Sequence, residues 1–233
     1  MDISEELLYA IRNEFEEAFE NNEIIQECFK KVADGTATYE EAYMFSNNVG
    51  DMLAEAYRNN ITEDKLPNGT LYYNICQKTL RPTLEENYSR VAEYTADVQT
   101  ALNRALGMGL QGIIPELDNS MIANLVDKIT EGSSFEEIAW LLGKPVTTFI
   151  DMTVDRTLKA NCDFQANSGL NPQLIRKAES SKALCKWCKN LAGTYDYKNA
   201  PEDIYKRHEN CRCTTEYVGN GIRQNVWSKK ILK

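Results

Sequence analysis

The stretch Arg207-His-Glu-Asn-Cys-Arg-Cys213 contains the only histidine of the 233-residue chain, shortly before two cysteines. A second cysteine pair lies upstream in Cys185-Lys-Trp-Cys188. Zinc takes four thiolate or imidazole ligands in a tetrahedron, and proteins commonly supply them as two local pairs. A C-x2-C turn can aim two sulfurs at one point, and Cys211 and Cys213 face the same side of an extended segment because strand side chains alternate. We therefore predict one zinc ion per chain, bound by Cys185, Cys188 and His208 together with Cys211 or Cys213.

The predicted zinc has a structural role. A module of about 60 residues has little core of its own, so a metal staple stabilises it. The five candidate ligands exceed the four that zinc needs, which favours a closed site. Glu209 directly follows His208, whereas zinc deaminases use an H-x-E spacing for their general acid and base. The alternative for these cysteines is a redox dithiol or a set of reduced core residues.

The rest of the composition indicates a protein of a reducing compartment. The chain has seven cysteines, an odd number that argues against a complete disulfide framework. Cys28, Cys76 and Cys162 are isolated in helical segments and are expected to be small core residues. No run of about 18 apolar residues predicts a membrane span, and the acidic, amphipathic N-terminus differs from a signal peptide. We expect the protein to stay in the cytoplasm where it is made.

Charge is distributed unevenly along the chain. Residues 176–233 hold 13 basic and 6 acidic residues, a net charge of +7. The whole chain has 26 basic and 35 acidic residues, so residues 1–175 hold 13 and 29, a net charge of −16. A basic C-terminal module on an acidic body indicates different partners for the two parts. The alternative is that the charged surfaces of both parts are only solvated.

The first two-thirds of the chain reads as helix. Leu7, Leu8, Ile11, Phe15 and Phe19 form an amphipathic stripe. Capping boxes at Thr38–Glu41 and Ser134–Glu137 mark helix starts. Further helices are predicted over Leu84–Leu106, from Pro115 to about Ile129, and over Val146–Gln165, with Gly143 and Pro145 closing the short helix that Ser134 opens.

The pattern changes after residues 167–172. Short segments that suit strands follow, and Gly219-Asn-Gly221 is a hairpin signal between the last two of them. We therefore predict a mainly α fold, with a helical body over residues 1–166 and a small α+β zinc-binding module with a β-hairpin over residues 167–233. The predicted strands are Gln173–Glu179, Thr194–Tyr197, Thr214–Val218 and Arg223–Ser228.

Two longer stretches are more specific than their metal ligands. They read CKWCKNLAGTYDY from Cys185 to Tyr197 and YKRHENCRCTTEYV from Tyr205 to Val218. This combination resembles the C-terminal module of the minor head, or head morphogenesis, proteins of tailed bacteriophages, the Mu F-like family. The resemblance covers roughly residues 170–233, and Glu209 stands where that family usually has proline. The helical remainder carries no motif of the family.

The resemblance implies a structural virion protein that associates with the portal or the major capsid protein during head assembly in the host cytoplasm. It implies few copies, oligomeric in the virion, and no membrane. No enzymatic role is carried over, because the chain lacks the catalytic domains that are fused to longer relatives. Packaged DNA then becomes a target for sequence-independent phosphate contacts. The basic residues around the predicted zinc are Lys182, Lys186, Lys189, Lys206, Arg207 and Arg212.

Two other classes of protein remain open at this point. The first is a zinc-dependent hydrolase or nuclease in which Glu202, Asp203 or Glu209 acts as the acid or base; the single histidine weighs against it. The second is a nucleic-acid-binding regulator whose zinc module contacts DNA. The acidic total charge and the absence of a recognisable reading helix weigh against that alternative.

Overall fold

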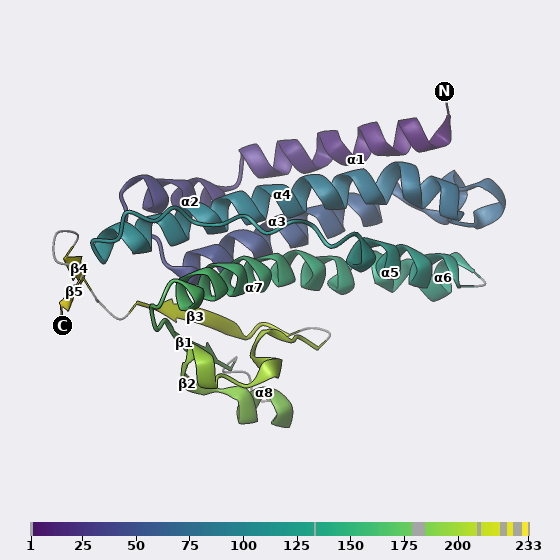
Figure 1. The fold of residues 1–233 in the computed structure, drawn as a ribbon. Helices are drawn as coiled ribbons and strands as arrows, with labels where there is room; N and C mark the ends of the chain where they lie inside the picture. Colours follow the sequence, from purple (N-terminus) through teal and green to yellow (C-terminus); the bar gives the residue numbers. More distant parts are fainter. Residues whose placement is uncertain are drawn as a thin grey trace.

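The computed structural model describes residues 2–132, 134–178, 185–208 and 211–219, and the backbone of 223–225 and 230–232. Long helices lie side by side, and a small sheet covers one side of them (Figure 1). This architecture confirms the predicted mainly helical body with a small C-terminal sheet near a cysteine cluster. Among the described helices, none is long and apolar enough to cross a membrane.

The helices are α1 (Ile3–Glu20), α2 (Glu23–Ala33), α3 (Tyr39–Asn60), α4 (Tyr73–Ala105), α5 (Asn119–Thr130), α6 (Phe135–Ile138), α7 (Lys144–Asn167) and α8 (Lys186–Leu191). Short 3-10 turns cover Glu63–Lys65, Pro67–Gly69, Ala139–Leu142, Tyr197–Asn199 and Glu202–Tyr205. The strands are β1 (Gln173–Lys177), β2 (Gly193–Asp196), β3 (Thr214–Val218), β4 (Arg223–Asn225) and β5 (Lys230–Leu232).

Local signals set several helix starts as predicted. At the start of α3, Thr38 caps the helix and its own backbone N–H donates to the carboxylate of Glu41, 2.8 Å away. At the start of α6, the backbone N–H of Glu137 donates to the hydroxyl of Ser134 at 3.4 Å. Such caps satisfy backbone N–H groups that have no partner inside the helix. The predicted stripe of α1 is also confirmed, since Leu7, Ile11 and Phe15 are buried.

The start predicted for α4 is wrong. The helix begins at Tyr73, well before Leu84, and continues through Pro82. Proline removes one helical hydrogen bond and usually ends or kinks a helix. Here the segment around it is held by tertiary contacts: Leu80 and Leu84 are buried, and the hydroxyl groups of Thr83 and Tyr57 on α3 are 2.6 Å apart. Packing outweighs the local cost of proline.

Two other helix boundaries also differ from the prediction. Pro115 precedes α5 by several residues, and Asp118 caps that helix by accepting from the N–H of Ser120 at 3.0 Å. Gly143 ends the 3-10 turn that continues α6, as predicted, but it also caps α7, and Pro145 lies in the first turn of α7. Proline is favourable in a first helical turn, where its missing N–H has no partner to lose.

Helices α3 and α7 pack very closely at Gly50. A Cβ atom added at Gly50 would lie 2.8 Å from the Cα of Thr147 on α7. Only glycine therefore lets the two helices approach at this point. The close approach matters for function because α3 and α7 together carry the side chains that meet the C-terminal module.

The module contains a three-stranded antiparallel sheet in the order β2-β1-β3. Leu174 of β1 lies opposite Tyr217 of β3, and both are buried in the same core as the helices. Strand β4 pairs with β5 in a separate two-stranded sheet. Within the described residues, β3 pairs with β1 alone and β4 pairs with β5, so the predicted pairing of Thr214–Val218 with Arg223–Ser228 across Gly219–Gly221 is not found there. Residues 220–222 and 226–229 lie outside the described residues.

Candidate metal centre

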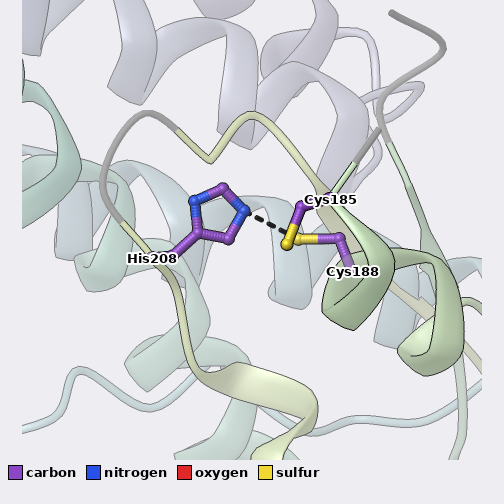
Figure 2. Close-up of side chains that lie close together, drawn as sticks. All are labelled: Cys185, Cys188 and His208. Carbon is purple, nitrogen blue, oxygen red and sulfur yellow. Dashed lines mark hydrogen bonds between the residues drawn. The ribbon is translucent and has the colours of Figure 1, made fainter. Parts of the chain in front are cut away.

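The five predicted ligands come together from two segments of the module. Cys185 caps α8 and Cys188 lies within it. His208 follows the turn Glu202–Tyr205, and Cys211 and Cys213 directly precede β3. The N–H of Cys211 donates to the carbonyl oxygen of His208 at 3.1 Å, which joins these two candidate ligands. Figure 2 shows the ring of His208 turned toward the sulfurs of Cys185 and Cys188.

Cys188 lies at the centre of the cluster. Its sulfur is 3.0 Å from Nε2 of His208 and 3.8 Å from the sulfur of Cys211. The ligand atoms of Cys185, Cys188 and His208 lie within 4.8 Å of one another, as do those of Cys188, Cys211 and Cys213. Two thiolates on one tetrahedral zinc lie about 3.8 Å apart, given Zn–S bonds of about 2.3 Å. The cluster can therefore bind a metal such as zinc.

The two sides of the cluster differ in exposure. Cys188, Cys211 and Cys213 are buried, at 3%, 3% and 4% exposure. Cys185 and His208 lie on the more open side, where the ring of Trp187 meets that of His208 edge to face at 6.1 Å. Neither group contains a carboxylate within the described residues. The cluster thus presents only sulfur and imidazole donors, the set that structural zinc sites use.

The thiols also differ in acidity. Backbone N–H groups of Cys188 and Trp187 at the start of α8 point at the sulfur of Cys185 and lower its pKa. Burial raises the pKa of Cys188 to about 11, and a hydrogen bond with Cys213 together with burial raises the pKa of Cys211. Buried thiolates need a compensating charge, and a soft divalent cation supplies it while releasing the protons.

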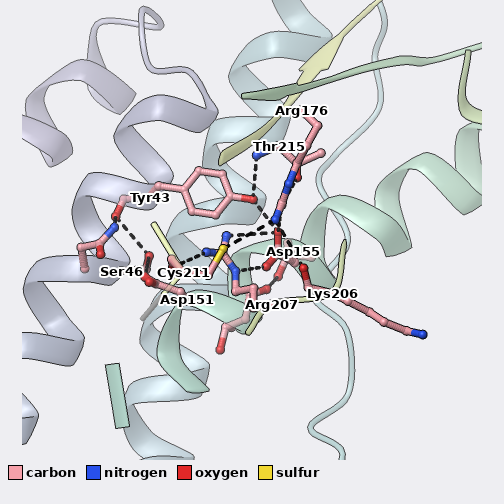
Figure 3. Close-up of polar contacts among 12 residues, drawn as sticks. Tyr43, Ser46, Asp151, Asp155, Arg176, Lys206, Arg207, Cys211 and Thr215 are labelled. Carbon is pink, nitrogen blue, oxygen red and sulfur yellow. Dashed lines mark hydrogen bonds and ion pairs between the residues drawn. The ribbon is translucent and has the colours of Figure 1, made fainter. Parts of the chain in front are cut away.

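The module meets the helical body at a group of buried charged and polar residues (Figure 3). We call it the buried ion cluster, and its members are Tyr43, Asp155, Arg176, Arg207 and Thr215. The side chains of Arg176, Arg207 and Asp155 are 0%, 1% and 2% exposed. Nε of Arg207 donates to Asp155 Oδ2, and its Nη2 lies 3.3 Å from Oδ1. Arg176 faces the same carboxylate from the other side, with Nη1 3.8 Å from Asp155 Oδ1.

Neutral groups complete the buried ion cluster. The hydroxyl of Tyr43 donates to Asp155 at 2.7 Å and accepts from the backbone N–H of Thr215 at 3.2 Å. The guanidinium of Arg207 stacks over the Tyr43 ring, 5.0 Å from its centre. Burial alone would lower the pKa of Arg207, but the Asp155 carboxylate raises it well above its usual value. Arg207 is therefore charged at neutral pH.

Sequence reasoning missed this cluster, although one signal was present. Arg176 follows Leu174 by two positions and so shares its face of β1. A charged residue on the buried face of a short strand requires a partner of opposite charge. Asp151 and Asp155, one helical turn apart on α7, supply carboxylates on the matching face. Burial raises the pKa of Asp151 to about 6, and Ser46 donates to it at 2.7 Å.

The basic residues predicted to contact DNA are placed differently from one another. The prediction for Arg207 is wrong, because its side chain is buried against Asp155 and cannot reach a phosphate. Arg212 pairs with Asp51 at 3.2 Å, and Lys206 pairs with Asp203 at 2.6 Å. Lys186 and Lys189 are exposed on α8. Lys182 and Glu209 lie outside the described residues.

A separate apolar groove lies on the other part of α7. Its volume is about 790 Å³, and it is lined by residues of α5, α6 and the first half of α7. Leu125 and Phe149 form part of its floor, and Trp140 on its rim is 55% exposed. None of the five candidate ligands lines this groove.

Comparison of the chain with protein-family models, with curated proteins and with solved structures finds no match. The geometry of the cysteine–histidine cluster is therefore the observation from which a function can be proposed. The resemblance of residues 170–233 to phage head proteins stays a prediction from the sequence.

Proposed function

We propose that the chain is a structural head protein of a tailed bacteriophage, whose C-terminal module is held together by one zinc ion per chain. The single observation that carries this proposal is the convergence of five cysteine and histidine ligands from two segments upon Cys188. The same segments carry the resemblance to minor head proteins. Cys185, Cys188 and His208 bind the zinc together with Cys211 or Cys213.

Three features support a scaffolding role for the metal over a catalytic one. Three of the five ligands are buried, which leaves little room for a substrate at the metal. No described carboxylate belongs to either ligand group, whereas a zinc hydrolase needs a general acid or base near its metal-bound water. Asp203, one candidate for that role, is engaged in an ion pair with Lys206.

The proposed partner is the portal or the major capsid protein, or both, with few copies of the chain in each phage head. The acidic helical body would face protein, because packaged DNA repels negative charge. The module would face DNA through Lys186 and Lys189, which are exposed on α8. Assembly would take place in the host cytoplasm, where thiols stay reduced and available for zinc.

The test combines metal analysis with phage genetics. Purified without chelator, the full-length chain should contain about one zinc per molecule, as a four-ligand site requires. In the phage that encodes the chain, an early stop codon and Cys188→Ser should both abolish normal heads in electron micrographs of lysates. Glu202→Gln, which alters an exposed carboxylate of the same module, should leave head production and zinc content unchanged.

Two outcomes would overturn the proposal. Normal infectious heads from the stop allele would exclude a role in head assembly. Loss of phage production with Glu202→Gln, at normal zinc content and normal incorporation into heads, would indicate chemistry at the module and favour the hydrolase.

A further inference from the structure

The loop that supplies the metal ligands also supplies the buried ion cluster. Arg207 directly precedes His208, and its Nη1 donates to the carbonyl oxygen of Cys211 at 3.2 Å. The same guanidinium binds Asp155 of α7 through its Nε and Nη2 atoms. One side chain therefore connects the backbone between two candidate ligands to the helical body.

Arg176 holds the loop from its other side. Its Nη2 lies 3.3 Å from the carbonyl oxygen of Lys206 and 3.9 Å from the sulfur of Cys211. Its Nη1 donates to the hydroxyl of Thr215 at 2.7 Å, just after the last cysteine. The two arginines thus bracket the segment that carries His208 and Cys211. Asp155 is the carboxylate that both of them share.

Burial makes this arrangement sensitive to the loss of one partner. Removing one member of a buried ion pair leaves an uncompensated charge and costs far more than losing an exposed pair. Without Asp155, the two guanidinium groups would repel each other and seek water. His208 and Cys211 would then be held less firmly, and metal binding would have to order them.

From these contacts we infer that Asp155 is a positioning residue for the metal centre. Through Arg207 and Arg176 it orients the segment that carries His208 and Cys211, so metal binding and docking of the module on α3 and α7 are coupled. The inference rests on the proposed zinc site. By thermodynamic reciprocity, a loaded site also strengthens docking by the same free energy with which docking strengthens metal binding.

The experiment compares Asp155→Asn with Asp163→Asn in the full-length chain. Asp163 also lies on α7 and also accepts a hydrogen bond from the module, but from Tyr197, which is not next to a ligand. Zinc affinity is measured by competition with a chromophoric chelator. Partners of metal ligands typically change metal affinity by about 10- to 100-fold. We expect a loss of that size for Asp155→Asn and wild-type affinity for Asp163→Asn.

Two further measurements separate positioning from a general loss of stability. The free energy of unfolding of each metal-free variant is measured by urea titration. A difference in zinc affinity can then be compared with the difference in stability. Cobalt replaces zinc in a second titration, and its absorption spectrum should keep a four-coordinate form in Asp155→Asn because the ligands themselves are unchanged. If Asp155→Asn does not fold, Tyr43→Phe replaces it. This variant keeps the Asp155 carboxylate and removes the hydroxyl that donates to it and accepts from the N–H of Thr215, so it should weaken zinc binding in the same direction, by less.

Each outcome has a distinct meaning. A wild-type chain that binds no zinc would overturn the proposed function and this inference together. A wild-type chain that binds one zinc, with equal affinity in Asp155→Asn and Asp163→Asn, would overturn the coupling alone. Equal losses of affinity in both variants would likewise show that stability, rather than positioning, controls the metal.

Discussion

Thr215 of β3 donates its backbone N–H to the hydroxyl of Tyr43 on α3, 3.2 Å away, and that hydroxyl in turn donates to Asp155 on α7. The hydroxyl of Tyr43 thus joins β3, the edge strand of the module, to both α3 and α7. Leu174 and Tyr217 are buried in the same core as these helices. The module is therefore a docked part of the molecule, and the metal centre lies beside its docking surface.

Removal of the metal should loosen the module and leave the helices largely intact. The helices have a core of their own, whereas a small module gains much of its folding free energy from its metal, on the order of 10 kcal/mol. After chelation at neutral pH, the far-ultraviolet helix signal should be retained. Limited proteolysis should then cut after Asn167, the last residue of α7. Cleavage spread evenly along the chain would contradict this expectation.

Cys211 should be the fourth zinc ligand. Its sulfur lies 3.8 Å from that of Cys188, and a guanidinium N–H of Arg176 faces it at 3.9 Å. A cationic donor stabilises a thiolate ligand. Cys211→Ala should therefore lose its zinc on dialysis, whereas Cys213→Ala should retain it with reduced affinity. The reverse order of the two variants, measured by metal analysis, would assign the ligand to Cys213.

The capping carboxylate of Glu41 should make stability depend on pH. Burial alone would raise its pKa, but hydrogen bonds from Lys31 and Thr38 lower the pKa from 4.5 to about 2. A carboxylate whose pKa is lower in the folded protein than in the unfolded chain stabilises the fold at pH values above the unfolded pKa. For Glu41 this stabilisation is lost as the pH falls from 4.5 through 2. At pH 7 the Glu41 carboxylate contributes up to about 3 kcal/mol to the free energy of unfolding, because each unit of pKa shift corresponds to about 1.4 kcal/mol.

Urea unfolding of wild type and Glu41→Gln checks this dependence. The difference in unfolding free energy should be largest at neutral pH and should shrink steadily below pH 4.5. Glu40→Gln is the matched control, because Glu40 is exposed one position earlier on the same helix. A difference for Glu41→Gln that stays constant with pH would contradict the assigned role of its carboxylate.

Gly50→Ala should destabilise the helical body. The added Cβ atom would lie 2.8 Å from the backbone of Thr147, so α3 and α7 would have to separate. Overpacking of this kind costs roughly 1–3 kcal/mol, against a gain of about 1 kcal/mol in helix propensity. Gly109→Ala serves as the control, because a Cβ atom added at Gly109 has no neighbouring atom within 4 Å. Thermal unfolding that leaves Gly50→Ala as stable as Gly109→Ala would show that the two helices can separate at no cost.

Charge reversal on α8 should weaken DNA binding without releasing metal. Lys186 and Lys189 are exposed, and neither is a metal ligand. For each lysine that no longer binds a phosphate, the slope of affinity against salt should decrease by about one. Lys186→Glu/Lys189→Glu should thus bind duplex DNA more weakly, with zinc content unchanged and with Lys198→Glu as the exposed control. Equal binding by the double variant and wild type would exclude α8 as the DNA-binding element.

Much of the molecule follows from local sequence. The caps at Thr38 and Ser134 and the apolar stripe of α1 were predictable, because hydrogen bonds and side-chain spacing within one helix determine them. The donor set of the metal centre was predictable for the same reason, since the C-x2-C and C-x-C spacings place ligands in pairs before any tertiary contact forms.

Other features were decided by the tertiary structure alone. α4 continues through Pro82 because Leu80 and Leu84 are buried, and burial depends on helices far away in the sequence. Arg207 looked like a surface residue for phosphate, but Asp155, 52 positions earlier, holds it inside the molecule. Whether a charged side chain lies in water or in a buried pair depends on whether a distant partner compensates its desolvation. Sequence spacing carries no record of that partner. The candidate metal ligands were therefore visible in the sequence, whereas the buried ion cluster beside them was not.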